Sequence, residues 1–126
     1  MIHGIGIDLV EIRRMEKSIA RFGERLAGRI LTGAELDEFR NSRRPAPFLA
    51  KRFAAKEAAV KALGTGFRGL AALHDIGVGH DDLGKPYLCY APALQQQLQQ
   101  QGISRSHLSI TDEAGMALAW VLLEAD

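Results

Sequence analysis

Residues 48–63 read Phe48-Leu49-Ala50-Lys51-Arg52-Phe53-Ala54-Ala55-Lys56-Glu57-Ala58-Ala59-Val60-Lys61-Ala62-Leu63. Alanine has the highest intrinsic helix propensity, and the glycines at 64 and 66 provide the kind of stop that ends many helices. The stretch therefore predicts one long helix, from about Phe48 to Leu63, against which the rest of the fold packs.

Strand patterns lie on both sides of this helix. Residues 2–12 alternate apolar side chains with glycines and one aspartate, which predicts a strand. Shorter strand patterns follow the helix, at 76–79, 87–90, 107–111 and 116–123. The last of them is apolar on both faces, which favours a central, covered strand.

Helical spacing of apolar residues predicts three shorter helices, at about 12–26, 32–41 and 92–101. The second begins with Thr32 and Glu35 at the spacing of a capping box, and residues 43–47 are predicted to form a loop. No linker is long enough to separate two domains. We therefore expect an α+β fold, a single domain over residues 1–126 with a mostly antiparallel sheet packed against the long helix.

The composition is that of an ordinary globular domain. The 126 residues are 47% hydrophobic and 25% charged, which argues against a disordered tail. No apolar run reaches the roughly 18–20 residues of a membrane-spanning helix, and no export signal opens the chain. The single cysteine, Cys89, suits a reducing compartment. We expect a cytoplasmic protein without a membrane partner.

The charges are distributed unevenly. Residues 1–68 hold 14 of the 16 Lys and Arg and 8 of the 15 Asp and Glu, a balance of +6, whereas residues 69–126 have a balance of −5. This asymmetry indicates an anionic partner for the basic half, which could be nucleic acid, phosphate groups or an acidic protein. On the first predicted helix the cations form a stripe, which is either a solvated face or a docking surface for an acidic partner: Arg14, Lys17, Arg21 and Arg25.

Asp8 is the first candidate for chemistry. It shares a face of the first predicted strand with Gly4 and Gly6. A charge on an apolar strand is costly unless it is paired or bound to a metal, and the glycines leave room for another group to approach the backbone. The competing interpretation is a carboxylate that caps a turn or pairs with a nearby Arg.

On the long helix, Glu57 stands among three cations, Arg52, Lys56 and Lys61. Pairs four residues apart usually support a helix surface. However, an isolated carboxylate among cations is a natural Mg²⁺ ligand, because Mg²⁺ takes one or two protein carboxylates together with substrate phosphates. Asp8 and Glu57 could form such a pair.

His107, Ser109 and Thr111 share one face of the predicted strand at 107–111, while Leu108 and Ile110 point to the core. This row suits phosphate or sugar oxygens, although it could equally be the solvated face of an edge strand. It is not typical of a hydrolase, since Ser109 lacks the Gly-x-Ser-x-Gly turn.

These segments together resemble the holo-[acyl-carrier-protein] synthase family, the stand-alone bacterial 4′-phosphopantetheinyl transferases. Four motifs carry the resemblance in the same order: Gly4-Ile5-Gly6-Ile7-Asp8-Leu9-Val10-Glu11, the stretch from Phe48 to Gly66, Gly84-Lys85-Pro86-Tyr87, and His107-Leu108-Ser109-Ile110-Thr111. The resemblance covers nearly the whole chain, and the second motif is the specific one. Asp112-Glu113 departs from it, because some members have His there.

The resemblance implies transfer of the 4′-phosphopantetheine arm of coenzyme A to a serine of apo acyl carrier protein, with release of adenosine 3′,5′-bisphosphate, in support of fatty acid biosynthesis. Asp8 and Glu57 would then hold Mg²⁺ against the coenzyme A pyrophosphate, and Lys61 would stabilise the leaving phosphate. Glu57 would also help to deprotonate the carrier serine, directly or through a metal-bound water.

The same resemblance implies the binding residues. Arg52 and Lys56 would hold coenzyme A phosphates, Lys85 and Pro86 would shape the wall around the adenosine, and His107 and Ser109 would contact the nucleotide end. The acidic carrier would dock on Arg14, Arg21 and Arg25. Family members form homotrimers with coenzyme A in clefts between subunits, which would also cover apolar strand surface.

Two alternatives belong to other classes. A non-catalytic phosphate- or RNA-binding module could use the basic N-terminal half, although no aromatic platform interleaves its cations, since Phe22, Phe39 and Phe48 occupy predicted core positions. We therefore expect no nucleic-acid partner. A metal-dependent phosphohydrolase would use water where the transferase uses the carrier serine.

Overall fold

The computed structural model describes residues 1–64 and 73–126. Its elements are, in order, β1 (Ile2–Glu11), α1 (Ile12–Phe22), α2 (Glu24–Ile30), α3 (Gly33–Arg40), α4 (Pro45–Leu63), a 3₁₀ turn (Leu73–Asp75), β2 (Ile76–His80), β3 (Pro86–Tyr90), α5 (Pro92–Gln100), β4 (Ile103–Glu113) and β5 (Met116–Ala125). The expected α+β class is confirmed. The expected stop at Gly66 lies outside the described residues.

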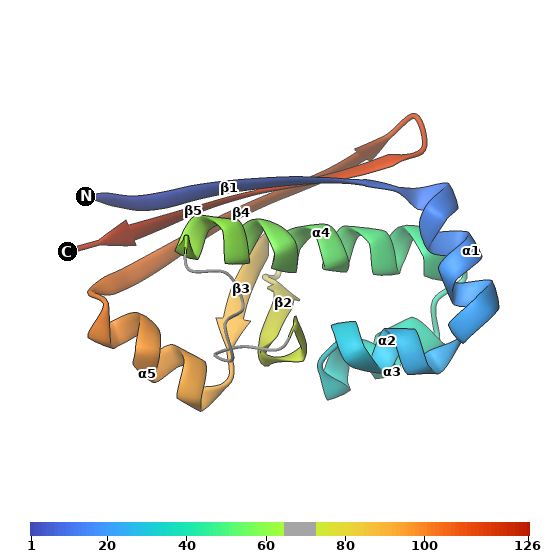
Figure 1. Ribbon diagram of the computed structural model, residues 1–126, viewed down its shortest axis with the longest axis horizontal. Coiled ribbons are helices and arrows are strands. Elements are labelled where there is room, and N and C mark those ends of the chain that lie inside the picture. Colours follow the sequence, from blue (N-terminus) through green and yellow to red (C-terminus); the bar gives the residue numbers. More distant parts are fainter. Residues whose placement is uncertain (65–72) are drawn as a thin grey trace.

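All strand pairs are antiparallel. β1, β5 and β4 form a three-stranded sheet in that order, with β5 in the centre, and β2 and β3 form a separate hairpin. Figure 1 shows α4 running along one face of the three-stranded sheet, with α1, α2 and α3 at one end and α5 at the other. The predicted sheet packed on a long helix is therefore confirmed.

Two glycines of β1 explain how closely this strand approaches α4. A Cβ atom on Gly4 would lie 2.0 Å from the Ala62 carbonyl oxygen, and one on Gly6 would lie 1.9 Å from that of Ala58. Any larger residue at either position would therefore collide with helix backbone. The group that the glycines admit is α4 itself.

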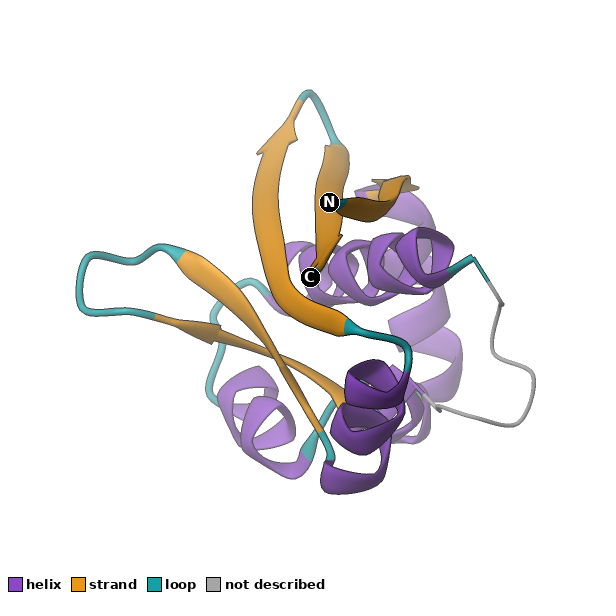
Figure 2. Cartoon of the chain, turned by 90° about the vertical axis from the view of Figure 1, so that its left-hand side faces the viewer, coloured by secondary structure: helices purple, strands orange, loops and turns teal. Residues whose placement is uncertain are grey.

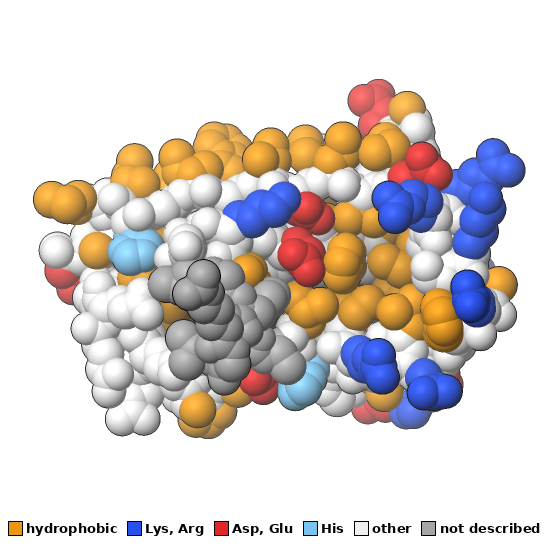
Figure 3. Space-filling model, viewed as in Figure 1, with side chains coloured by type: hydrophobic (Ala, Val, Ile, Leu, Met, Phe, Trp, Pro, Cys, Tyr) orange, Lys and Arg blue, Asp and Glu red, His pale blue; other side chains and the backbone are white. Residues whose placement is uncertain are grey.

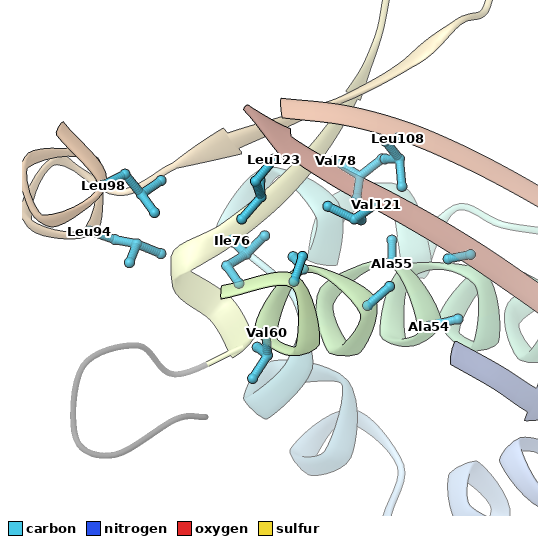
Figure 4. Close-up of a cluster of buried hydrophobic side chains, with 14 of the residues drawn as sticks. Ala54, Ala55, Val60, Ile76, Val78, Leu94, Leu98, Leu108, Val121 and Leu123 are labelled. Atoms are coloured by element: carbon cyan, nitrogen blue, oxygen red, sulfur yellow. The ribbon is translucent and has the colours of Figure 1, made fainter. Parts of the chain in front are cut away.

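The alanines of α4 form the centre of the core. Ala54, Ala55, Ala58 and Ala59 are buried and pack with Val121 and other residues of β5, β2 and α5. Figure 4 shows these side chains converging between α4 and the strands. None of the described helices, α4 included, is long and apolar enough to cross a membrane.

No element in the described part of the chain covers the other face of the sheet. Ile5, Ile7 and Leu9 of β1 are 54%, 56% and 59% exposed, and Trp120 of β5 is 51% exposed. Figure 2 shows the helices on one side of the sheet only. The prediction that β5 is central is confirmed, but the prediction that it is covered on both faces is wrong for the single chain. We call the exposed side chains of Ile5, Ile7, Leu9 and Trp120 the apolar outer face.

The structure confirms only some of the local predictions. The expected helix at 12–26 breaks at Gly23, whose φ of 57° ends α1 and begins a new helix, and Phe22 is 49% exposed rather than in the core. The expected loop at 43–47 is partly helical, because α4 begins at Pro45, and proline fits the first turn of a helix. The capping box of Thr32 and Glu35 is confirmed.

Candidate active site

Asp8, Glu57 and Lys61 come together where β1 crosses α4. Asp8 lies on the same face of β1 as the two glycines, so its side chain points to the helix. Lys61 Nζ donates to Asp8 Oδ1 at 2.9 Å and to the Ile7 carbonyl at 3.1 Å. Glu57 precedes Lys61 by one helical turn. The partner of Asp8 is thus a lysine rather than an arginine. Glu57 is close enough to both residues for their charges to affect its pKa, and the pairing of Asp8 with Glu57 around Mg²⁺ stays a prediction.

The Asp8 carboxylate lies close enough to Glu57 to affect its protonation. Burial raises the pKa of Glu57 above its usual value, the nearby Asp8 carboxylate raises it further, and Lys61 opposes the increase. The Lys61 ammonium therefore interacts electrostatically with both Asp8 and Glu57. Figure 3 shows acidic and basic side chains meeting over the crossing of β1 and α4.

This donor set fits a magnesium ion better than zinc. Mg²⁺ is bound by one or two carboxylates and completed by water and substrate phosphates, and a partly buried carboxylate beside a second carboxylate attracts a divalent cation. Structural zinc sites need four His or Cys ligands. In the described part of the chain, no group of three or more His, Cys, Asp and Glu side chains is placed to hold a metal.

Arg52 and Lys56 lie inside the protein, one turn apart on α4. Lys56 is fully buried, and its ammonium donates to Glu35 Oε1 at 2.5 Å and to the Ile30 carbonyl at 2.6 Å. This burial contradicts the expectation that Lys56 holds a coenzyme A phosphate, because its ammonium has no exposed surface and bonds to groups inside the protein. Sequence reasoning missed the partner, Glu35, beyond its capping role.

Arg52 is also largely buried but faces a pocket. Its guanidinium donates to Glu35 Oε2 at 3.1 Å and stacks on the Phe48 ring at 4.5 Å from the centroid. The pocket has a volume of about 200 Å³ and is lined in part by Lys51, Arg52, His80 and Pro86. Of the residues predicted to bind coenzyme A, Arg52 and Pro86 thus share one cavity, which we call the Arg52 pocket.

Other contacts define the rim of the Arg52 pocket. Lys51 Nζ lies 3.8 Å from Asp112 Oδ1, and both residues line the cavity. Lys85 is exposed, and its backbone N–H donates to Asp81 Oδ1 at 2.8 Å in the turn before Pro86. Sequence reasoning missed Lys51 as a lining residue, although its place in the second motif beside Arg52 was a usable signal.

His107 and Ser109 lie elsewhere. Both are exposed, and they line a shallow pocket of about 210 Å³ beside Trp120. His107 contacts the carboxylate of Glu124. The inward position of Leu108 is confirmed by its burial, so His107 and Ser109 project from the opposite face of the sheet. Within one chain the structure does not bring them to Asp8 and Glu57.

The predicted docking residues are exposed at one end of the molecule. Arg14 and Arg21 lie on α1 and Arg25 lies on α2, and Figure 3 shows Lys and Arg gathering at this end. The Arg21 guanidinium lies 5.1 Å from the centroid of the exposed Phe22 ring. A pocket of about 190 Å³ is lined by Phe22, Arg25, Leu26 and Arg29. Apolar surface in this basic region was not foreseen.

The fold and this arrangement of residues correspond to a known class of protein. The family model described as the 4′-phosphopantetheinyl transferase superfamily matches residues 4–124. A holo-[acyl-carrier-protein] synthase of Nitrosospira multiformis is 54% identical over 124 residues, which cover 98% of this chain and 99% of that protein.

Solved structures agree. The crystal structure of the holo-[acyl-carrier-protein] synthase of Neisseria meningitidis superposes with a TM-score of 0.94 at 52% identity, covering 98% of this chain and 99% of that one. That of Bacillus anthracis, in complex with CoA (3′,5′-ADP), superposes with a TM-score of 0.82 at 40% identity, covering 100% and 99%. The chain belongs to the holo-[acyl-carrier-protein] synthase family of phosphopantetheinyl transferases.

Proposed function

We propose that this protein transfers the 4′-phosphopantetheine moiety of coenzyme A to a serine of apo acyl carrier protein and releases adenosine 3′,5′-bisphosphate. The observation that carries the proposal is the cluster of Asp8, Glu57 and Lys61 at the crossing of β1 and α4 in a chain of this family. The Bacillus anthracis relative bound to CoA (3′,5′-ADP) supports the choice of donor. The reaction supports fatty acid biosynthesis.

In this reaction the serine oxygen forms a bond to the phosphorus that bears pantetheine, and the bond from that phosphorus to the bridging oxygen breaks. Glu57 accepts the serine proton. Its carboxylate is partly buried and its pKa is raised, which suits a general base. Lys61 reaches over β1 from α4 and supplies positive charge to the departing phosphate. Most of the rate enhancement comes from positioning and charge stabilisation.

Asp8 and Glu57 would hold Mg²⁺, which supplies positive charge beside the pyrophosphate when it is bound. The fit rests on the two carboxylates that share one ammonium. This assignment makes the enzyme magnesium-dependent, and coenzyme A is then the co-substrate.

The Arg52 pocket would receive the nucleotide. Arg52 and Lys51 supply charge for phosphate oxygens. Pro86 lines the cavity, and Lys85 precedes it in the hairpin turn, so the pair would form the wall around the adenosine. Lys56 is not part of this binding set, because it is buried behind Arg52 and Glu35.

A homotrimer would complete the site. The apolar outer face is large for a solvent-exposed sheet surface, and such patches mark interaction sites. His107 and Ser109 lie on this face. In a closed ring of subunits, these two residues would reach the nucleotide bound by the neighbouring subunit, which would place each site at a subunit interface.

The acidic carrier protein would dock on α1 and α2. Exposed arginines at positions 14, 21 and 25 present one sign of charge, which steers an acidic partner and fixes its orientation. Residues 1–126 act as one transferase domain in this proposal, and the lone cysteine suits the cytoplasm. Neither a nucleic acid nor a membrane is a partner in it.

The test is the intact mass of apo acyl carrier protein after incubation with the enzyme, coenzyme A and Mg²⁺. We expect the gain of one phosphopantetheine arm, which is lost with EDTA or with Glu57→Ala. No gain with folded enzyme and a free carrier serine would refute the proposal. Release of phosphopantetheine from coenzyme A without a carrier would instead indicate a hydrolase.

A further inference from the structure

A buried carboxylate joins three elements behind the Arg52 pocket. Glu35 of α3 is 2% exposed. Its Oε1 accepts from the Thr32 backbone N–H at 2.9 Å and from Lys56 Nζ at 2.5 Å. Its Oε2 accepts from Arg52 at 3.1 Å and from the Val78 backbone N–H at 3.0 Å. A capping role accounts for the Thr32 bond alone, so the other three bonds need a separate reason.

Two of those bonds fix parts of the Arg52 pocket. Arg52 lines the cavity, and Val78 lies two residues before His80, which lines it too. The Val78 carbonyl accepts a second bond from Arg52 at 3.2 Å. Together with the Phe48 ring stacked on it, these contacts hold the guanidinium in one orientation and tie it to β2.

The cluster contains two cations and two carboxylates. Glu35 is one anion between two cations, Arg52 and Lys56, and burial alone would raise its pKa, but Lys56 and the hydrogen bonds hold the pKa below its usual value. Glu38 is the other carboxylate near Arg52, at 3.4 Å, and its side chain is 52% exposed. Arg52 is therefore held by one buried and one exposed carboxylate, and the same residue lines the pocket.

We propose that Glu35 is a positioning residue for coenzyme A, which holds the Arg52 guanidinium at the floor of the pocket in the orientation that receives a nucleotide phosphate. The inference rests on the proposed function, because that function assigns the pocket to the nucleotide. Glu35 does not touch the ligand, since it lies behind Arg52. It acts by fixing a charged donor whose free side chain would otherwise sample many rotamers.

The test needs variants that change Glu35 without leaving two buried cations unpaired. Glu35→Gln alone removes the buried anion that Arg52 and Lys56 share, which is strongly destabilising. We therefore compare Lys56→Met with the double variant Glu35→Gln/Lys56→Met. The first keeps the Glu35–Arg52 pair. The second has the same net charge as the native cluster, because it loses one anion and one cation, but it replaces the Glu35 carboxylate by an amide. Glu35→Asp, which keeps the charge and shortens the side chain, is a third variant that does not depend on Lys56.

Three measurements are made on each variant: the melting temperature, the affinity for adenosine 3′,5′-bisphosphate by calorimetry, and the steady-state constants for transfer. We expect Lys56→Met to bind the bisphosphate like the native enzyme. We expect the double variant to bind it about tenfold more weakly than Lys56→Met, as for loss of one oriented charge-assisted contact. The KM for coenzyme A rises in parallel, while kcat and the KM for the carrier change little. Glu35→Asp should show the same selective effects on bisphosphate affinity and on the KM for coenzyme A, but smaller ones.

A purely structural role predicts a different result. If Glu35 is only structural, its replacement lowers the melting temperature and changes the KM for coenzyme A and the KM for the carrier together, without a selective loss of bisphosphate affinity. This outcome overturns the inference. Equal affinity of Lys56→Met and the double variant for the bisphosphate also overturns the inference about Glu35. In either case, the proposed function still stands if the native enzyme transfers phosphopantetheine to the carrier. A native enzyme that neither binds the bisphosphate nor modifies the carrier refutes both.

Discussion

The Lys61 ammonium lies 2.9 Å from the Asp8 carboxylate, which joins the last turn of α4 to β1 across the proposed active site. The side chain of Asp8 is mostly shielded, whereas that of Lys61 is 54% exposed. The Lys61 side chain can therefore turn towards a bound phosphate without a change in α4 or β1. Asp8 serves two cations in the proposed reaction, this ammonium and the metal.

Asp8→Asn should reduce transfer by about a hundredfold or more, because it removes charge from the site that stabilises the transition state. The fold should survive, since Lys61 can extend into solvent when its partner is neutral. The measurements are kcat by carrier mass analysis and the melting temperature. A variant that keeps native kcat would show that Asp8 only pairs with Lys61.

Gly6→Ala tests the close approach of β1 to α4. The new Cβ atom would lie 1.9 Å from the Ala58 carbonyl oxygen, so the strand or helix must move, and overpacking of this kind costs about 1–3 kcal/mol. We expect a lower free energy of unfolding, together with loss of activity as Asp8 moves away from Glu57. Chemical denaturation measures the first effect.

Gly28→Ala is the matched control for that change. Gly28 lies within α2, and a Cβ atom there meets nothing within 4 Å. Since alanine is the better helix former by about 1 kcal/mol, this variant should be as stable as the native protein or more so. Equal stability of Gly6→Ala and Gly28→Ala would mean that β1 and α4 are not packed as closely as described.

Strong local patterns made much of the fold predictable from the sequence. Strict alternation marked β1, alanine content marked α4, and the spacing of Thr32 and Glu35 marked a capped helix. The break at Gly23 was not predictable from apolar spacing, because that spacing continues past the glycine into α2. Only its positive φ shows that the chain turns there.

The site was predictable to the extent that its residues share a motif or a strand face. Asp8, Glu57 and Lys61 could be grouped because a strand and a helix in contact bring them together. The burial of Lys56 could not, because a lysine within a charged helix is usually exposed. Its anionic partner lies 21 residues earlier, in a different element, and no local spacing encodes that pairing.

Trp120→Glu tests the apolar outer face. In a trimer this substitution would place a charge in a buried interface, which is costly. We therefore expect a lower molar mass by light scattering and a lower rate of transfer, while the fold of the single chain stays intact. Leu83→Glu is the control, since Leu83 is 96% exposed in the turn between β2 and β3. An unchanged mass for Trp120→Glu would mean that the outer face is not the subunit interface.

Arg21→Gln tests carrier docking on α1. Exposed charge pairs contribute about 0.2–1 kcal/mol each, so the KM for acyl carrier protein should rise by a factor of about 1.4 to 5 while the KM for coenzyme A stays the same. Gln99→Glu makes the same change in net charge on α5, which Figure 1 places at the opposite end of the molecule from α1. If attraction between the two proteins depended only on overall charge, both variants would raise the carrier KM equally. A rise in the carrier KM for Arg21→Gln alone would place the docking surface on α1. Added salt should reduce the difference between Arg21→Gln and the native enzyme, because screening weakens the native contact.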